Sequence, residues 1–303
     1  MAELLLDEGH SVIGVDNLSD EYDARLKRWR LDRLCGRPGF SFANADVRNR
    51  DLKHLRLDAV IHMAARVGVR KSLSDPWAYV DTNVNGTLNL LELCRREGIP
   101  KFVLASSSSV YGGSKGAPSR EDGDTCRPAS PYAASKKSAE LLAYSYHHLY
   151  GLDVTALRYF TVYGPAGRPD MSVFRFIRWL SEERPIQIFG DGRQRRDFTH
   201  VDDIAHGTIA ALRPLGFEII NLGSNSPVAL LDVIDRLGEL TGSKPELRFQ
   251  ERHSADVEET WADVGRARTI LAWHPAIPCA RGLETAVAWY GDNLSWARHI
   301  SIE

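Results

Sequence analysis

Two short segments, SSSSVYG at residues 106–112 and PYAASKK at residues 131–137, decide how the rest of the chain is interpreted. The first overlaps the end of the apolar run KFVLAS (101–106), which is typical of a buried strand. The second opens a segment that predicts a helix from Tyr132 to about Tyr150. Hydroxyl side chains just past a strand's carboxyl end lie where open α/β sheets bind their ligands.

Tyr132 and Lys136 are four residues apart in the predicted helix, so their side chains share one face, one turn apart. A lysine ammonium beside a phenol favours the phenolate, so we expect the pKa of Tyr132 to fall below its reference value of about 10. Such a tyrosine is a candidate general base near neutral pH. The pair alone also fits a half-buried tyrosine and a solvated lysine, and the preceding hydroxyls favour the catalytic interpretation.

The composition indicates a soluble globular protein: of 303 residues, 43% are hydrophobic and 26% are charged. The net charge of −2 and the lack of a long basic stripe argue against nucleic acid as a partner. No apolar run approaches the roughly 20 residues of a membrane helix, and the acidic start lacks the basic flank of a signal peptide. The four scattered cysteines predict no metal site. We therefore expect a cytoplasmic protein with no membrane partner.

Strands and helices alternate over residues 1–160, which indicates βαβ units and a doubly wound, Rossmann-like parallel sheet of the α/β class. We expect this dinucleotide-binding domain to include residues 198–223, where the chain returns to it. Residues 161–197 and 224–303 are richer in loops and are expected to form a smaller α/β substrate domain. The predicted strands of the first domain are SVIGVD (11–16), FSFANAD (40–46), DAVIHMAA (58–65), KFVLAS (101–106) and DVTALRYF (153–160).

Further motifs follow along the chain, namely IHMAA (61–65), NVNGTLNLLE (83–92), LRYFTVYGP (157–165), GRPDM (167–171) and RDFTHVDDI (196–204). With the two segments above, they make the chain resemble the extended short-chain dehydrogenase/reductases nearly from end to end. The likeness is greatest to their NAD-dependent nucleotide-sugar epimerases. This resemblance implies NAD as the cofactor and a UDP-sugar as the substrate.

An acid at the end of the second strand of a dinucleotide-binding fold bonds the adenosine ribose, and a glycine-rich loop lies roughly 20 residues before it. Asp16 fits that acid and would repel the 2′-phosphate of NADP, although Asp16 and Asn17 equally fit an ordinary turn. Counting back from Asp16 leads beyond Met1, so the first strand and the glycine-rich loop of the family are missing. We expect either a natural start upstream of Met1 or an N-terminally truncated chain, with less than full activity as it stands.

The resemblance implies further cofactor contacts. Asp46 and Val47 resemble the family's contact to the adenine edge, with a strand-ending turn as the alternative. Ala64 and Ala65 are small enough for close approach of the cofactor backbone. Asn83 resembles an asparagine whose amide lies near the cofactor and the catalytic tyrosine. The full predicted cofactor set is Asp16, Asn17, Asp46, Val47, Ala64, Ala65, Asn83, Tyr132, Lys136 and Tyr159.

The resemblance also implies a hydride mechanism with Tyr132, Lys136 and Ser107 as catalytic residues. Tyr132 takes the proton of the sugar C4 hydroxyl, and Lys136 lowers the pKa of Tyr132 and binds the nicotinamide ribose. Ser107 orients the substrate oxygen, with the neighbouring serines as alternatives. Hydride passes from C4 to NAD and returns to the other face of the 4-keto sugar, so that NAD is not consumed.

The two residues after Ser107 discriminate between related reactions. The family's 4,6-dehydratases carry Asp-Glu there, whereas this chain has Ser108 and Ser109, which cannot act as an acid–base pair at neutral pH. The family's uronate decarboxylases usually have a glutamate in this segment, and this chain has none. Epimerisation is therefore the predicted reaction.

The predicted substrate is UDP-glucuronate. Thr161 occupies a position where galactose-type epimerases commonly have asparagine, and SSSSVYG, YFTVYGP and GRPDM together resemble UDP-glucuronate 4-epimerases. Ser108, Ser109 and Thr161 are expected to hold the C6 carboxylate together with Arg168, whose guanidinium suits a carboxylate but also fits a solvated loop. By the same resemblance, the UDP moiety is expected to contact Gln187, Arg196 and Asp256.

Two alternatives remain at this stage. The first is a UDP-glucose or UDP-N-acetylhexosamine 4-epimerase. The second is a non-catalytic protein that binds a nucleotide sugar and lacks the cofactor loop, against which the intact catalytic trio argues. Family members commonly dimerise through the helices near 76–97 and 131–150, and apolar residues on several faces of the second helix are compatible with a homodimer.

Overall fold

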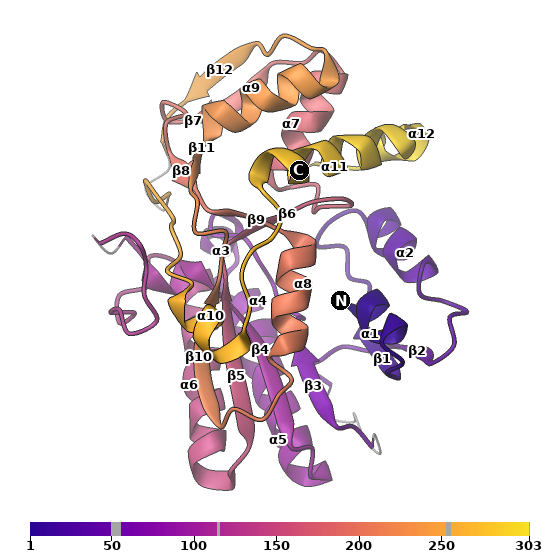
Figure 1. The fold of residues 1–303 in the computed structure, drawn as a ribbon, viewed down its shortest axis with the longest axis vertical. Coiled ribbons are helices and arrows are strands. Elements are labelled where there is room, and N and C mark those ends of the chain that lie inside the picture. Colours follow the sequence, from indigo (N-terminus) through magenta and orange to yellow (C-terminus); the bar gives the residue numbers. More distant parts are fainter. Residues whose placement is uncertain (50–55, 114–115, 253–255, 303) are drawn as a thin grey trace.

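Four parallel strands form the largest sheet in the computed structural model, which describes residues 1–49, 56–113, 116–252 and 256–302. The spatial order is β10-β5-β4-β3. The strands are β3 (Ala59–His62), β4 (Lys101–Ser107), β5 (Asp153–Tyr159) and β10 (Phe217–Leu222). Every residue of β4 is buried, as expected for a parallel strand covered on both faces. Because the strands are parallel, their carboxyl ends all lie at the same end of the sheet (Figure 1).

A second, two-stranded parallel sheet holds the N-terminal part of the chain. It pairs β1 (Val12–Asp16) with β2 (Phe40–Asn44) and lies beside α1 (Ala2–Asp7) and α2 (Ala24–Asp32). Within the described residues, the strand ladders of this sheet and of the sheet ending in β3 are separate. The predicted α/β class with parallel sheets is confirmed, although the described strands form more than one sheet.

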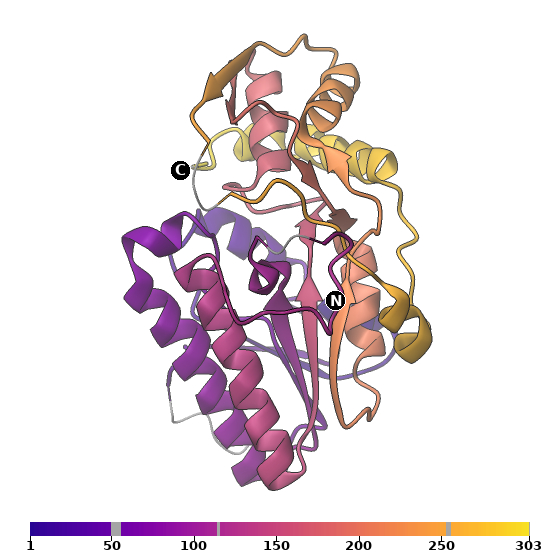
Figure 2. The ribbon, with the colours of Figure 1, turned by 90° about the vertical axis from the view of Figure 1, so that its left-hand side faces the viewer.

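Helices cover both faces of the larger sheet. Figure 2 shows α5 (Gly86–Glu97) and α6 (Pro131–Tyr150) side by side on one face, and α8 (Val201–Ala210) and α10 (Gly265–Leu271) on the other. The helix α6 begins at Pro131 because Ser130 caps it, and it ends at Gly151, whose φ of 68° stops the helix in a left-handed turn. The helix predicted from Tyr132 to about Tyr150 is confirmed.

The helical stretch before α5 is interrupted. A single long helix was expected from Pro76 to about Glu97, but this stretch is divided into α4 (Pro76–Tyr79), a π-helical turn, η1 (Val80–Asn85), and α5, with the short helix α3 (Lys71–Ser74) before them. π-Helical turns are rare and frequently occur at functional sites. Here the turn directs Asn83, which is 1% exposed, into the protein interior.

The remaining elements form a smaller layered unit above the main sheet (Figure 1). Its strand pairs are β6 (Thr161–Tyr163) with β9 (Phe198–His200), β7 (Ile186–Phe189) with β12 (Leu247–Gln250), and β8 (Arg195–Arg196) with β11 (Val228–Ala229). Its helices are α7 (Ser172–Ser181), α9 (Leu230–Thr241), α11 (Cys279–Asp292) and α12 (Leu294–Ala297). The predicted residue division between a dinucleotide and a substrate domain stays a prediction.

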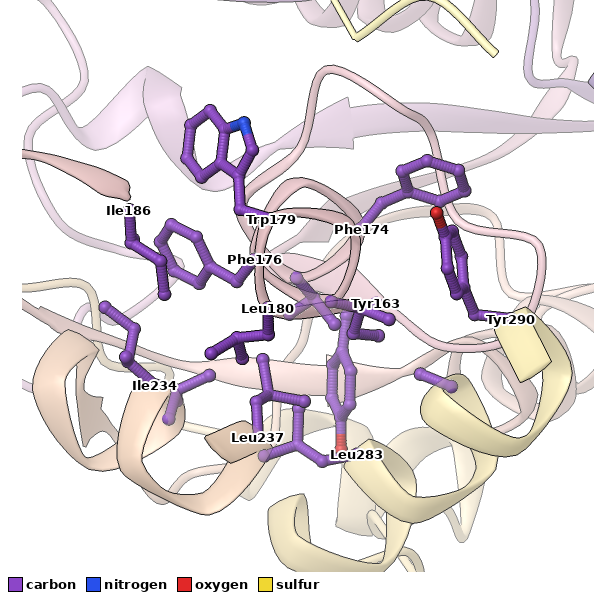
Figure 3. Packing of buried hydrophobic residues seen from close by; sticks show 14 of the residues in the cluster. Tyr163, Phe174, Phe176, Trp179, Leu180, Ile186, Ile234, Leu237, Leu283 and Tyr290 are labelled. Atoms are coloured by element: carbon purple, nitrogen blue, oxygen red, sulfur yellow. The ribbon is translucent and has the colours of Figure 1, made fainter. Parts of the chain in front are cut away.

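The core of the smaller unit surrounds α7. Figure 3 shows Phe176 of α7 beside Ile186, and Leu180 of the same helix directed toward Ile234 and Leu237 of α9. An aromatic contact then joins this unit to the N-terminal part, since the ring of Trp29 in α2 lies 5.3 Å from that of Trp289 in α11. Among the described helices, none combines the length and apolar character that a bilayer crossing requires.

Candidate active site

The predicted serine segment lies at the carboxyl end of β4. Ser107 is the last residue of the strand, and its hydroxyl oxygen accepts a hydrogen bond from the backbone N–H of Ser109 at 3.2 Å, which caps the 3₁₀ helix η2 (Ser108–Tyr111). Ser106 points to the other face, as alternate strand residues do, and donates to Glu140 at 2.6 Å. Ser107 and Ser106 therefore serve different sides of the strand.

Tyr132 lies in the first turn of α6. It is buried and packs edge-on against Tyr79, with ring centroids 6.1 Å apart. Burial raises the pKa of Tyr132, while hydrogen bonding to Ser107 and the positive charge of Arg168 act in the opposite direction. The predicted fall of this pKa through Lys136 is wrong, because desolvation outweighs the lowering effects and the neighbouring cation is Arg168.

Lys136 is 5% exposed, and its ammonium donates to the carbonyl oxygen of Ala105 at 2.7 Å. Desolvation lowers its pKa to about 8, and the nearby Glu140 carboxylate acts in the opposite direction. Among the described residues, Ala105 is its one hydrogen-bond acceptor, whereas an ammonium carries three donors. The remaining donors of this buried group suit a polar ligand such as the ribose hydroxyls of NAD.

Asn83 holds the loop after β3 against α6. Its side-chain oxygen accepts from the Arg66 N–H at 2.7 Å, and its amide nitrogen donates to the Arg66 carbonyl and to the Ser135 hydroxyl, both at 2.9 Å. The predicted small residues Ala64 and Ala65 immediately precede Arg66 and are half-buried. Both amide hydrogens of Asn83 are thus used by protein groups, so its contribution is to position this loop.

His62 is the last residue of β3, and the hydrogen bonding of its ring shows whether a polar ligand fits at this strand end. Its Nε2 lies 3.1 Å from the hydroxyl of Thr87, which itself donates to the Asn83 carbonyl at 2.5 Å, so Nε2 is the donor of the pair. Nδ1 is buried without a hydrogen-bond partner in the described part of the chain. Burial lowers the pKa of His62 to about 3, so the ring is neutral. A buried acceptor at this strand end fits a polar ligand or a water molecule.

The residues predicted for the adenosine end lie together at the ends of β1 and β2. Asp16 has a half-exposed carboxylate 4.0 Å from the Lys27 ammonium. Asn17 donates to Asp46 at 2.8 Å, which links the two strand ends. Val47 is buried directly after Asp46. Acidic and amide groups at two neighbouring strand ends provide the acceptors that ribose hydroxyls and an adenine amine require.

Tyr159 ends β5 with a buried ring. Its hydroxyl lies 2.8 Å from the Thr208 hydroxyl of α8 and 3.6 Å from the sulfur of Met63. Burial raises its pKa well above the ordinary value. Tyr159 therefore contributes an aromatic surface and a neutral hydroxyl at the strand ends, on the side of α8.

Thr161 and Arg168 line the same small pocket beneath the loop between β6 and α7. Arg168 is held by a two-point ion pair with Asp170, with Nε–Oδ1 at 3.0 Å and Nη2–Oδ2 at 2.5 Å. Burial raises the pKa values of both Tyr132 and Tyr79, and the positive charge of Arg168 opposes both rises, which is consistent with a guanidinium near the catalytic candidate. A wider hollow beside α10 contains no predicted site residue.

Arginine side chains gather around Asp256. Arg70 forms an ion pair with Asp256 at 2.5 Å, and its guanidinium lies 3.9 Å from the ring centroid of Phe189. Burial lowers the pKa of Arg196, the charges of Arg252 and Arg70 lower it further, and Asp256 opposes them. This excess of positive charge suits a diphosphate.

Gln187 shares strand β7 with Phe189. It is exposed, and since it lies two residues from Phe189, both side chains are on one face of the strand. Arg70 and Phe189 were not among the site residues predicted from the sequence. Arg70 is far from both partners in the sequence, so no spacing pattern could associate it with them.

Comparison with known proteins places the chain in a family. The profile described as NAD dependent epimerase/dehydratase family matches residues 1–223. The UDP-glucuronate 4-epimerase of Thermodesulfobacterium geofontis is 53% identical over 308 residues, covering 100% of this chain and 95% of that protein. UDP-glucuronate 4-epimerase 1 of Arabidopsis thaliana is 38% identical, covering 93% of this chain and 71% of that protein.

Solved structures agree with these matches. The UDP-glucuronic acid 4-epimerase of Bacillus cereus, in complex with UDP-glucuronic acid and NAD, superposes with a TM-score of 0.92 at 37% identity, covering 96% of this chain and 94% of that one. The UDP-glucose 4-epimerase of Thermotoga maritima has a TM-score of 0.87 at 29% identity, covering 97% and 94%. The predicted family, its fold and its use of NAD are confirmed. The chain belongs to the NAD-dependent epimerase/dehydratase family of enzymes.

Proposed function

We propose that this chain catalyses the 4-epimerisation of UDP-glucuronate to UDP-galacturonate. The observation that carries the proposal is the position of Arg168, whose charge reaches Tyr132 from the wall of the adjacent pocket. A guanidinium beside the base that serves C4 suits a sugar with a carboxylate at C6. The full-length similarity to UDP-glucuronate 4-epimerases supports the same substrate.

Tyr132 and Ser107 are assigned to the C4 hydroxyl of the sugar, and Lys136 is assigned to the cofactor. Tyr132 removes the proton of the C4 hydroxyl and later returns it, and Ser107 orients that oxygen by hydrogen bonding. The Lys136 ammonium donates one hydrogen bond to the Ala105 carbonyl, and its other N–H groups bind the nicotinamide ribose. NAD, when bound, would supply the reversible hydride acceptor that inversion at C4 requires. Asp16, Asn17, Asp46 and Val47 would hold the adenosine end.

The C6 carboxylate is assigned to Arg168, Thr161, Ser108 and Ser109. Asp170 binds Nε and Nη2 of Arg168, so Nη1 is the atom that meets the substrate carboxylate. The serines are half-buried in η2 and carry no charge that would repel the carboxylate.

The diphosphate is assigned to the arginines around Asp256. Arg196 is the partly buried member, and Arg70 and Arg252 lie close enough to affect its pKa. We further assign the uridine to the face of β7 that carries Gln187 and Phe189. Asp256 keeps the arginine group oriented before substrate binds.

The test compares turnover of UDP-glucuronate with turnover of UDP-glucose by the purified protein supplied with NAD. We expect UDP-galacturonate as the product and a higher kcat/KM for UDP-glucuronate. Faster turnover of UDP-glucose would contradict the assignment of Arg168. A separate assay of nucleotide released on denaturation reports whether NAD is bound, so that a missing cofactor is distinguished from a wrong substrate.

We also propose a homodimer formed through the outer surfaces of α4, η1 and α6. Trp77 is 81% exposed, and Val80 and Leu141 are exposed on neighbouring elements. Exposed apolar groups of this size favour a protein contact. Light scattering is expected to give twice the chain mass for the parent and the mass of one chain for Trp77→Lys; a monomeric parent would refute the dimer.

The four cysteines are free thiols, which is compatible with a reducing compartment. We propose the cytoplasm as the location of the protein on that ground.

A further inference from the structure

An ion pair that the proposed chemistry leaves unused lies beneath the candidate active site. Glu140 of α6 and Arg158 of β5 have side chains that are each 1% exposed. They form two parallel hydrogen bonds of 2.9 Å, Nε to Oε1 and Nη2 to Oε2. Burying two charges is costly, and breaking such a pair leaves an uncompensated charge behind. A fully buried pair therefore calls for a functional or structural reason.

Glu140 is bonded to the strand end that carries the catalytic serine. It follows Lys136 by one helical turn, and its Oε1 accepts a hydrogen bond from Ser106 at 2.6 Å. Ser106 precedes Ser107, and Lys136 donates to the carbonyl of Ala105 at 2.7 Å. Residues 105–107 of β4 are thus fixed to α6 at two consecutive residues.

Arg158 extends this connection to β5 and η2. It pairs with Ser106 across the sheet, and its guanidinium lies 4.8 Å from the ring centroid of Tyr111. The Tyr111 hydroxyl donates to Asn221 of β10 at 2.7 Å. The ion pair therefore joins α6 to three strands and to the helical turn that holds the serines.

Glu140 also dominates the charge around Lys136. From α6 itself Lys136 is flanked by Tyr132 and Glu140, and from β3 by His62, whose ring is neutral. From η1 and α5 the polar groups are those of Asn83 and Thr87, which do not titrate. Arg158 of β5 lies behind Glu140. Glu140 is the described group whose charge favours the ammonium form of Lys136.

We propose that Glu140 is a positioning residue for the epimerisation: it fixes Ser107 and Lys136 relative to each other. Its negative charge also favours the ammonium form of Lys136. Arg158 is the counter-charge that keeps Glu140 ionised. The inference rests on the proposed function only for the roles of Ser107 and Lys136 in turnover.

The decisive experiment compares Glu140→Gln with Arg158→Met, which break the same ion pair but remove opposite charges. The titration of Lys136 is followed by NMR of ¹³C,¹⁵N-labelled lysine, with Lys136→Met used to assign the signal. Glu140→Gln is expected to move this titration, and the alkaline limb of the pH–kcat profile, down by about one pH unit. Arg158→Met is expected to move both upward, because Glu140 keeps Lys137 as a partner at 3.3 Å. Shifts of the same sign, or no shift, would overturn the proposal.

A double variant covers the case in which either single variant fails to fold. Glu140→Gln with Arg158→Met removes both charges of the ion pair, so that neither is left without its partner, and it also removes the carboxylate that binds Ser106. We expect kcat to fall at least about tenfold with KM within about threefold of the parent, since a charge-assisted hydrogen bond at the strand end is lost. A kcat equal to that of the parent would mean that the ion pair between Glu140 and Arg158 contributes only to the stability of the fold. The lysine titration needs no substrate, so it remains informative if UDP-glucuronate is not turned over.

Discussion

The ionisation of Tyr132 depends on which cation stands beside it. Spacing on one helix face pointed to Lys136, but the Lys136 ammonium is directed to the Ala105 carbonyl, and the positive charge that opposes the burial-driven rise of the pKa of Tyr132 is that of Arg168. In the proposed mechanism, this one guanidinium would act both on Tyr132, the proposed base at C4, and at the proposed carboxylate site. Epimerisation of a uronate and the ionisation of its catalytic base would then be coupled through a single residue.

Replacing Arg168 with methionine is expected to affect both binding and the pH profile. Loss of a charge-assisted hydrogen bond should raise KM for UDP-glucuronate by about 10–100-fold. Tyr132 must lose its proton to act, and removing a nearby positive charge raises its pKa, so the acid limb of kcat moves to higher pH by up to about one unit. Steady-state kinetics across pH measures both effects.

Arg168→Lys is the matched control for this variant. It retains the charge but loses the planar fork, so it should raise KM while leaving the acid limb in place. If the methionine variant kept the parent's acid limb, Arg168 would not be the cation that acts on Tyr132.

At the scale of elements, the π-helical turn η1 decides where the loop after β3 lies. A regular α-helix through residues 80–85 would rotate Asn83 away from its three hydrogen bonds to Arg66 and Ser135. We expect Asn83→Ala to lower the free energy of unfolding by about 2–3 kcal/mol and to weaken NAD binding, because buried polar partners are left unsatisfied. Thermal unfolding and NAD titration measure the two effects.

Asn85→Ala, in the same turn, serves as the comparison. Asn85 bonds only the exposed Asp81 at 3.1 Å among the described residues, so its loss should change stability by less than about 0.5 kcal/mol. Equal losses in the free energy of unfolding for the two variants would mean that the three hydrogen bonds of Asn83 do not stabilise the protein more than the single bond of Asn85 does.

The packing of α11 on β6 and β9 depends on a glycine. A methyl group at Gly282 would come within 2.0 Å of the Tyr163 hydroxyl and 2.9 Å of the His200 ring. Gly282→Ala is therefore expected to destabilise the protein by about 1–3 kcal/mol, measured by denaturant unfolding. Gly291→Ala in the same helix meets nothing within 4 Å and is expected to stabilise it by up to about 1 kcal/mol. A destabilised Gly291 variant together with a neutral Gly282 variant would contradict this view of the interface.

For the whole molecule, burial of a neutral histidine ties stability to pH. The pKa of His62 is about 3 in the folded protein, below its ordinary value of 6.5, so the unfolded chain binds the proton more readily. The free energy of unfolding therefore falls as pH decreases from about 6.5 toward 3, and is insensitive to this group above 6.5. His62→Asn should flatten that part of the profile in urea titrations at several pH values; an unchanged slope would exclude His62 as the source.

Much of the local structure could be predicted from the sequence because it depends on neighbouring residues. The limits of α6 follow from Ser130, Pro131 and Gly151, and the apolar run of β4 predicted a strand that is buried throughout. The family motifs likewise located Tyr132, Lys136 and Ser107 on adjacent elements. Their exact ionisation did not follow, because a pKa depends on burial and on charges from other elements.

The order of the motifs and their hydrophobic pattern determined the fold class, the family and the positions of the candidate catalytic residues, since these depend on short spacings within single elements. Tertiary structure alone decided which charges meet. Arg70 forms an ion pair with Asp256 and packs on the ring of Phe189. Glu140 forms an ion pair with Arg158 and accepts a hydrogen bond from Ser106. The residues of each set come from segments far apart in the sequence. Their physical origin is close packing at strand ends, where side chains from several elements share one small volume with little water.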